Sequence, residues 1–154
     1  MSADLEQPYR GAFVGNTHYF AVRVYIEDTD IGGVVYHAKY LGFLERARSD
    51  MLRSVGIDQR TAIENGTGVY AVAELQIKYL KPARLDDDLV IATNLSEVRA
   101  ASCRIRQQIT RRNEMIAQAT VTAAFLGPGG RPRRQPAEWA EKFSSLLSPI
   151  SEGP

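Results

Sequence analysis

Two aspartates and two glycines lie immediately before a predicted helix. Asp28 and Asp30 are followed by Gly32 and Gly33, and an apolar pattern with helical spacing begins near residue 37. The N–H groups in the first turn of a helix have no partners within the helix, and together with the helix dipole they favour negative charge. A carboxylate opposite such amides suits acyl transfer, because it attacks a carbonyl or activates water while the amides polarise the carbonyl oxygen.

The same residues also have a purely structural interpretation. An aspartate before a helix is often only a cap, and loops rich in aspartate and glycine are often only turns. In the functional interpretation, the glycines let the backbone approach a ligand closely. Spacing alone leaves both interpretations open.

A long helix is predicted over residues 37–55. Its apolar residues recur at helical spacing, and a glycine stands where a left-handed residue commonly ends a helix. These positions are Tyr40, Leu44, Ala47 and Met51, with Gly56 at the end. One helix of this length needs a second layer to bury its apolar face.

Strands are predicted on both sides of this helix. Apolar and polar residues alternate before it, over residues 18–26, as a strand with two different faces requires. Four later segments show the same alternation, over residues 74–79, 89–95, 102–110 and 115–126. Short connections favour an antiparallel sheet, so the fold class is α+β with an early central helix. A single helix cannot cover both faces of this sheet, and we therefore expect a homo-oligomer.

Three regions are expected along the chain. Residues 1–17 show little periodicity and are predicted to form a loose N-terminal arm. Residues 18–127 form the domain, which closes at a glycine-rich turn. Residues 128–154 form a basic C-terminal tail with a short helix predicted over residues 136–147.

Composition excludes several classes of protein. The 154 residues include 19 lysines and arginines against 18 acidic residues, a net charge of +1 that gives no support to nucleic-acid binding. Neither a membrane-spanning apolar stretch nor a secretory signal is evident. A single cysteine, Cys103, excludes an internal disulfide and fits the reducing cytoplasm. With only His18, His37 and Cys103 as soft ligands, no metal site is expected. The nucleotide-binding glycine motifs are absent, so no cofactor is expected either.

Residues 25–57 carry a resemblance to a known family. Their sequence, YIEDTDIGGVVYHAKYLGFLERARSDMLRSVGI, resembles the hotdog-fold acyl-CoA thioesterases of the 4-hydroxybenzoyl-CoA thioesterase superfamily. The pattern D-x-D-x-x-G-V-V-Y-H-x-x-Y and the following E-x-A-R are similar to the Tol–Pal-associated branch. Residues 72–91, VAELQIKYLKPARLDDDLVI, also look like this branch. The similarity extends over about residues 20–125.

This resemblance implies a fold and an activity. The implied fold is a five-stranded antiparallel sheet wrapped around one long helix, in a homodimer or a homotetramer whose site lies at the subunit interface. The implied activity is hydrolysis of an acyl-CoA thioester to a free acid and coenzyme A. Within the D-x-D motif, the aspartate nearer the glycine does the chemistry, which is Asp30 here. An acyl-carrier protein and the Tol–Pal envelope system are possible partners.

The resemblance suggests roles for other residues. Asp30 acts as a nucleophile or as a general base, and the backbone N–H of His37 stabilises the oxyanion. The His37 ring either orients Asp30 or the ligand, or has no role beyond its backbone. Tyr36 and Gly33 contact substrate, although packing is a second interpretation for Tyr36. Arg99 resembles an arginine that contacts phosphate in the 4-hydroxybenzoyl-CoA enzyme, or else it is a solvated charge.

Three further residues have structural interpretations beside the catalytic ones. Asp28 is expected to organise the loop rather than to act as a second catalytic acid. Glu45 either polarises a site residue or binds water, or it pairs with Arg46 or Arg48 on the exposed helix surface. Cys103 lies on the apolar side of its strand and is expected in the core, since a buried cysteine behaves as a small hydrophobe.

Two other functions compete with hydrolysis. A hotdog module can bind acyl chains or an acyl-carrier protein without catalysis, and it would then serve as a scaffold. A hotdog hydratase or dehydratase needs a positioned acid–base pair for the β-carbon, and apart from Asp30 and His37 no such spacing is evident. Retention of Asp30 favours the hydrolase.

Overall fold

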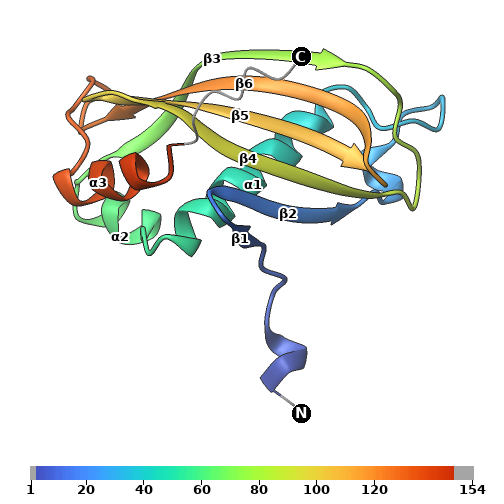
Figure 1. The fold of residues 1–154 in the computed structure, drawn as a ribbon, viewed down its shortest axis with the longest axis horizontal. Coiled ribbons are helices and arrows are strands. Elements are labelled where there is room, and N and C mark those ends of the chain that lie inside the picture. Colours follow the sequence, from blue (N-terminus) through green and yellow to red (C-terminus); the bar gives the residue numbers. More distant parts are fainter. Residues whose placement is uncertain (1–2, 148–154) are drawn as a thin grey trace.

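An antiparallel sheet curves around one long helix in the computed structural model, which describes residues 3–147 (Figure 1). The strand order is β1-β2-β4-β5-β6-β3, and every neighbouring pair is antiparallel. The strands are β1 (Ala12–Val14), β2 (Thr17–Arg23), β3 (Val69–Tyr79), β4 (Asp88–Val98), β5 (Ser102–Arg111) and β6 (Glu114–Leu126). This is the α+β hotdog arrangement that the sequence predicts.

The sheet has six strands where five are expected. The additional strand, β1, lies within residues 1–17, for which a loose arm is predicted, and it pairs with β2 across a tight turn. Gly15 in this turn has φ of +60°, a conformation that glycine adopts without strain. Gly11 is equally constrained, because a Cβ there would lie 2.2 Å from the carbonyl oxygen of Tyr19. Residues 1–2 lie outside the described residues.

A buried hydrogen bond between His18 and Asp50 joins this N-terminal segment to the long helix. His18 is fully buried, and its Nε2–H donates to Oδ2 of Asp50 at 2.8 Å. The backbone N–H of Gly11 donates to the same carboxylate oxygen at 2.9 Å. Burial lowers the pKa of His18, so the ring is held neutral beside the carboxylate. The segment from Gly11 onward is therefore part of the domain.

The long helix α1 spans Lys39–Ser54 and begins two residues later than predicted. Residues before it form a tight turn in which the Lys39 N–H donates to the Tyr36 carbonyl at 2.8 Å, which delays regular helix. Its end matches the prediction: Gly56 has φ of +83°, and the Gly56 and Ile57 amides bond back to the last turn. These two hydrogen bonds end the helix at a glycine in the left-handed conformation.

The apolar face of α1 packs on the concave face of the sheet. Tyr40, Leu44, Ala47 and Met51 are each at most 4% exposed, which confirms the predicted apolar stripe. The alternation predicted over residues 102–110 is confirmed, since β5 buries Cys103, Ile105 and Ile109. The strand predicted over residues 18–26 is shorter than expected: β2 ends at Arg23, and Ile26 lies in a short 3-10 helix with its side chain 75% exposed. Two buried polar side chains of the sheet, Thr93 and Gln107, lie among these apolar residues.

Two short helices cover one end of the sheet. Helix α2 (Gln59–Glu64) was not predicted, whereas α3 (Ala137–Ser145) falls within the helix predicted over residues 136–147. Trp139 and Phe143 of α3 pack on Tyr70, and Trp139 also contacts Phe125. The part of the predicted C-terminal tail from residue 148 to 154 lies outside the described residues. Among residues 3–147, the helices are too short or too polar to cross a bilayer.

Candidate active site

A small hairpin presents Asp30. Thr29 and Val35 form an isolated bridge, and the Asp30 N–H donates to the Val34 carbonyl at 2.8 Å. The chain reverses through Gly33, whose N–H donates to the Asp30 carbonyl at 3.0 Å and whose φ is +80°. Oδ1 of Asp30 accepts the Gly32 N–H at 2.8 Å. The carboxylate is thus exposed and oriented by its own turn, and its Oδ2 has no partner in residues 3–147.

Asp28 differs from Asp30 in its surroundings. Its side chain is buried, and Oδ2 accepts the Tyr25 N–H at 2.9 Å. The Nζ atom of Lys39 lies 3.9 Å from Oδ1 of Asp28. The backbone carbonyl of Asp28 accepts a hydrogen bond from the Tyr36 N–H. These contacts join both sides of the hairpin, which confirms the loop-organising role expected for Asp28.

The segment between the hairpin and α1 leaves amides free. In the described part of the chain, neither the His37 N–H nor the Ala38 N–H has an acceptor. Ala38 occupies the N-cap position but has no polar side chain, and no acidic residue follows in the first turn. Helix starts usually have a side-chain cap for these donors. The His37 and Ala38 N–H groups are therefore available to bind another acceptor.

A residue of the sheet fixes the position of the His37 backbone. Tyr79, the last residue of β3, donates its hydroxyl to the His37 carbonyl at 2.8 Å. The His37 ring is exposed and contacts the Tyr36 ring at 4.6 Å between centroids. No hydrogen bond joins the His37 ring to Asp30 or to any other residue from 3 to 147. Tyr36 is 46% exposed, so its ring stays accessible although it contacts the His37 ring.

Gly33 offers a direct test of the hairpin. In Gly33→Ala, the side chain would force an L-residue into the left-handed region, which costs about 1–2 kcal/mol. We expect a lower free energy of unfolding in urea and a lower kcat/KM, because the turn that orients Asp30 is strained.

The matched control is Gly42→Ala, within α1. A Cβ at Gly42 meets no atom within 4 Å and its φ is ordinary, so alanine should stabilise the helix by about 0.5–1 kcal/mol. Equal stabilities and activities for the two variants would contradict the assigned role of the turn.

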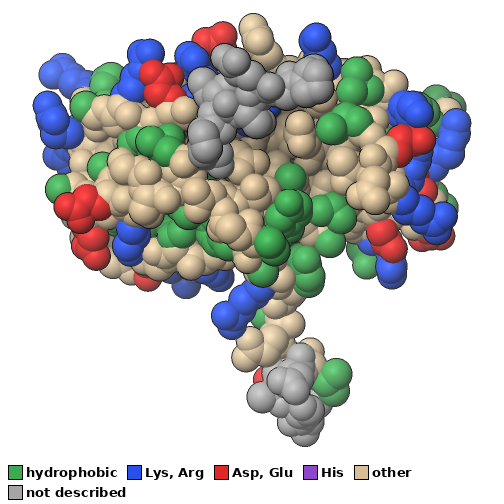
Figure 2. Space-filling view, viewed as in Figure 1, with side chains coloured by type: hydrophobic (Ala, Val, Ile, Leu, Met, Phe, Trp, Pro, Cys, Tyr) green, Lys and Arg blue, Asp and Glu red, His purple; other side chains and the backbone are tan. Residues whose placement is uncertain are grey.

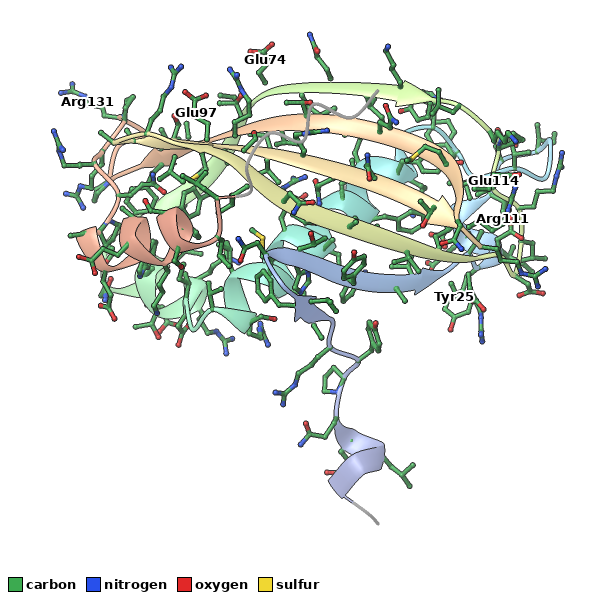
Figure 3. All side chains as sticks on the ribbon, viewed as in Figure 1. Tyr25, Glu74, Glu97, Arg111, Glu114 and Arg131 are labelled. Atoms are coloured by element: carbon green, nitrogen blue, oxygen red, sulfur yellow. The ribbon has the colours of Figure 1, made fainter. Side chains whose placement is uncertain are left out.

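Arg99 lies far from Asp30 within one chain. It follows β4 at the end opposite Asp88, and its side chain is exposed and pairs with Glu97 at 2.8 Å. At about 3.3 Å per residue, the length of β4 alone separates these ends by roughly 33 Å. In Figure 3, Glu97 lies at one end of the sheet, and Tyr25, just before the Asp30 hairpin, lies at the other. A single chain therefore does not bring Arg99 to Asp30.

The three arginines that follow β6 differ in their contacts. Arg133 donates through Nη1 to the carbonyls of Gly66 and Thr67, at 3.0 and 2.9 Å, and fastens the loop before β3. Arg131 and Arg134 are exposed. Basic side chains are visible at both ends of the molecule in Figure 2, so charge alone does not identify a phosphate-binding end.

A cavity of about 200 Å³ lies between α1 and β3, away from Asp30. Its walls combine apolar side chains with a few polar ones, namely Glu45, Arg48, Ser49, Met51, Leu52, Gln59, Tyr70, Ala71, Val72, Leu95, Cys103, Ile105, Ala123 and Phe143. Sequence reasoning did not find this cavity. One signal was present: Arg48 lies four residues after Leu44 and three before Met51, and so falls on the apolar side of α1.

Cys103 lines this cavity but is not a nucleophile. Its side chain is 4% exposed, and the thiol contacts Oε1 of Gln135 at 3.3 Å. Burial raises the pKa of the Cys103 thiol to about 11, so the thiolate is absent at neutral pH. The prediction that Cys103 belongs to the core is confirmed.

Comparisons with known proteins agree on one family. Residues 24–147 match the family described as the thioesterase-like superfamily. The chain is 42% identical over 132 residues to the acyl-CoA thioesterase YbgC of Haemophilus influenzae, which covers 85% of this chain and 97% of the relative. The chain belongs to the thioesterase-like superfamily.

Further relatives of this thioesterase support the assignment. A 1,4-dihydroxy-2-naphthoyl-CoA hydrolase of Acaryochloris marina is 30% identical over 132 residues, covering 81% of this chain and 96% of that protein. A probable thioesterase from Bartonella henselae has a solved structure with a TM-score of 0.74 at 37% identity, covering 78% of this chain and 99% of its own. A structure of 4-hydroxybenzoyl-CoA thioesterase, 22% identical, shares the fold with a TM-score of 0.75 and covers 86% of this chain and 99% of its own.

For a thioesterase, the geometry supplies two chemical groups. Asp30 provides a carboxylate and the turn before α1 provides amides, and within the described residues Oδ2 of the former and the His37 and Ala38 N–H groups of the latter have no partner. An attacking or proton-accepting carboxylate and an oxyanion donor are the minimum for acyl transfer. Within residues 3–147, Glu45 forms no ion pair with Arg46 or Arg48. The structure therefore does not support the interpretation of Glu45 as an ion-paired surface residue.

Proposed function

We propose that this protein is an acyl-CoA thioesterase that hydrolyses its substrate to a free acid and coenzyme A. The observation that carries the proposal is Asp30: an exposed carboxylate, fixed by its own hairpin, next to a helix start whose His37 and Ala38 amides have no acceptor within residues 3–147. The activities in the names of the YbgC relative and the naphthoyl-CoA hydrolase support it.

Two routes lead from this arrangement to products. As a nucleophile, Asp30 attacks the thioester carbonyl, the carbon–sulfur bond breaks, and coenzyme A leaves as a thiolate that takes a proton. Water then cleaves the resulting mixed anhydride and frees the acid. As a general base, Asp30 instead takes a proton from the water that attacks the carbonyl. In both routes negative charge develops on the carbonyl oxygen.

The His37 N–H is proposed as the donor to this oxygen. It precedes α1, it has no acceptor in residues 3–147, and Tyr79 fixes the carbonyl of the same residue. One donor of this kind typically contributes about 2.7–4 kcal/mol to transition-state stabilisation. The His37 ring is placed to shield or orient the ligand rather than to exchange protons with Asp30.

The proposed enzyme is a homodimer joined through β3. This strand lies at the edge of the sheet, is eleven residues long, and presents exposed apolar residues such as Val69 and Val72. A long unpaired edge invites pairing with another strand. A second copy of β3 fits this edge in an antiparallel pair, with both α1 helices on the same face of one continuous sheet. A homotetramer would be a pair of such dimers.

This pairing would complete the site. Tyr79 and the Asp30 hairpin lie at one end of β3, whereas Val69 and Arg99 lie at the other. An antiparallel pair places the first end beside the second end of the partner. Asp30 of one chain would then face Arg99 of the partner subunit, whose guanidinium suits the phosphates of coenzyme A. Tyr36 and Gly33 lie on the Asp30 side, where they would contact the pantetheine or the thioester.

The cytoplasm is the proposed location of this enzyme. Acyl-CoA is made and used in that compartment, and the unpaired, buried Cys103 suits its reducing conditions. The Tol–Pal envelope system remains a proposed association, which the resemblance to the YbgC branch supports.

Thiol release from a panel of acyl-CoA thioesters tests the function. We expect free coenzyme A to appear with at least one member at a rate above spontaneous hydrolysis, detected by a thiol reagent. The competing role, a module that binds acyl chains or an acyl-carrier protein, predicts binding without thiol release. Binding by calorimetry with no release from any member of the panel would refute hydrolysis.

A further inference from the structure

A guanidinium lines the cavity between α1 and β3. Arg48 projects from the apolar side of α1 and is half-buried, in contrast to its neighbour Arg46, which is exposed. Within residues 3–147, no carboxylate lies within salt-bridge distance of Arg48. A half-buried cation without a counter-ion is costly, and such groups normally pair.

Two buried polar residues of the sheet hold this cation in place. Gln107 donates through Nε2 to the Leu44 carbonyl and to Oγ1 of Thr93, both at 3.0 Å. Its Oε1 is thereby oriented toward Arg48 and accepts from Nη1 at 2.9 Å. Gln107 is 1% exposed and Thr93 is fully buried. The core thus accommodates two polar side chains whose hydrogen bonds lead to one guanidinium.

Most of the donors of Arg48 remain available. A guanidinium carries five N–H groups, and the protein uses one of them in the described residues. Burial lowers the pKa of Arg48 and the nearby Glu45 raises it, yet arginine keeps its charge at neutral pH. Glu45 is exposed at the cavity wall, so solvent screens its charge, while Arg48 lies deeper.

The cavity has room for part of an acyl chain. Its volume of about 200 Å³ exceeds the ~150 Å³ cavity that is known to hold a benzene molecule. Met51, Leu52 and Phe143 provide apolar walls. The cavity borders Tyr70, Ala71 and Val72 of β3, the edge at which the proposed dimer brings up Asp30 of the partner subunit.

We propose that Arg48 is a specificity residue that binds a carboxylate at the far end of the acyl group, so that the preferred substrates are ω-carboxyacyl-CoA thioesters. This inference rests on the proposed thioesterase function and adds the substrate class. A carboxylate accepts two parallel N–H bonds from a guanidinium and neutralises its charge. A hydroxyl neutralises no charge, and an alkyl end leaves Arg48 unpaired.

Matched substrates test this assignment. We compare three ω-carboxyacyl-CoA thioesters: adipyl-, pimeloyl- and suberyl-CoA. Each is paired with the thioester in which an isopropyl group, similar in size, replaces the terminal carboxylate. We expect the wild type to favour the carboxylate member in kcat/KM by roughly ten- to a hundredfold for at least one length, the ratio expected for hydrogen bonds between charged groups. The corresponding ω-hydroxy chain should fall between the two.

Arg48→Met should abolish this preference, so that kcat/KM for the carboxylate-ended chain no longer exceeds kcat/KM for the isopropyl-ended chain. Arg48→Lys keeps the charge but not the bidentate geometry, and should restore part of the preference. Arg46→Met, an equal change on the exposed side of the same helix, should leave the preference intact. A wild type without preference, a hydroxyl preferred over the carboxylate, or a preference that survives Arg48→Met would overturn the proposal.

A binding measurement separates this proposal from the thioesterase function. Calorimetry with non-hydrolysable thioether analogues of the same pairs reports on the cavity without turnover. Tighter binding of the carboxylate analogue, lost in Arg48→Met, would support the Arg48 site even if no substrate were hydrolysed. Equal binding of both analogues to the wild type would refute the site even if hydrolysis were found. Thermal melting confirms that each variant is folded.

Discussion

Replacing Asp30 with asparagine is expected to lower kcat/KM for acyl-CoA hydrolysis by roughly 10²- to 10⁴-fold. Asparagine has the same size and keeps an oxygen that can accept the Gly32 N–H, so the hairpin should survive. Only the charge and the basicity of the second oxygen are lost. Thiol release measures the activity, and circular dichroism on heating measures the fold.

Asp86→Asn is the matched control for this variant. Asp86 is an exposed aspartate in the loop before β4, and its φ of +66° is one that asparagine tolerates. The control removes the same charge and should retain full activity. Full turnover by a correctly folded Asp30→Asn protein would remove Asp30 from the mechanism.

Blocking the edge of β3 is expected to have the second largest effect. Ala73 is exposed in the middle of this strand, at an irregularity where β3 has no partner residue in β6. Ala73→Lys should therefore be tolerated by the single chain but should prevent two edges from pairing, since charged side chains protect natural sheet edges. We expect the mass in light scattering to fall from an oligomer to the 17.1 kDa chain.

Activity should fall together with the oligomer. If the site combines Asp30 of one chain with Arg99 of the partner subunit, a monomer lacks half of the proposed contacts. Ala12→Lys, an equal change at an exposed alanine of β1 on the opposite edge of the sheet, should alter neither mass nor activity. An active, monomeric Ala73→Lys protein would show that one chain suffices, and an unchanged mass would place the interface elsewhere.

Periodicity was sufficient for most of the fold. The alternation in β2, β4, β5 and β6 and the helical spacing in α1 predict their elements because one face of each is buried along its whole length. Elements with few residues escaped prediction. Residues 12–14 contribute three residues to the sheet, and α2 has six, so neither repeats often enough to show a period.

The start of α1 was misplaced for a local reason. Val34, Val35 and Tyr36 continue the apolar pattern into the hairpin, so the sequence shows no polar N-cap at which the helix must begin. The structure places Ala38 at that position. The absence of a capping side chain, which made the boundary hard to predict, also leaves the His37 amide free for an oxyanion.

For the candidate site, the sequence by itself determined the local parts. The order of Asp30, Gly33 and His37 is a property of consecutive residues, so a turn and a helix start follow from it directly. Tertiary structure alone decided that Arg99 lies at the far end of the same sheet, and that Arg48 meets Gln107 and Thr93 beneath α1. Those relations depend on how strands far apart in the chain pair and curve around the helix. Packing between distant segments, unlike a turn, leaves little trace in the spacing of neighbouring residues.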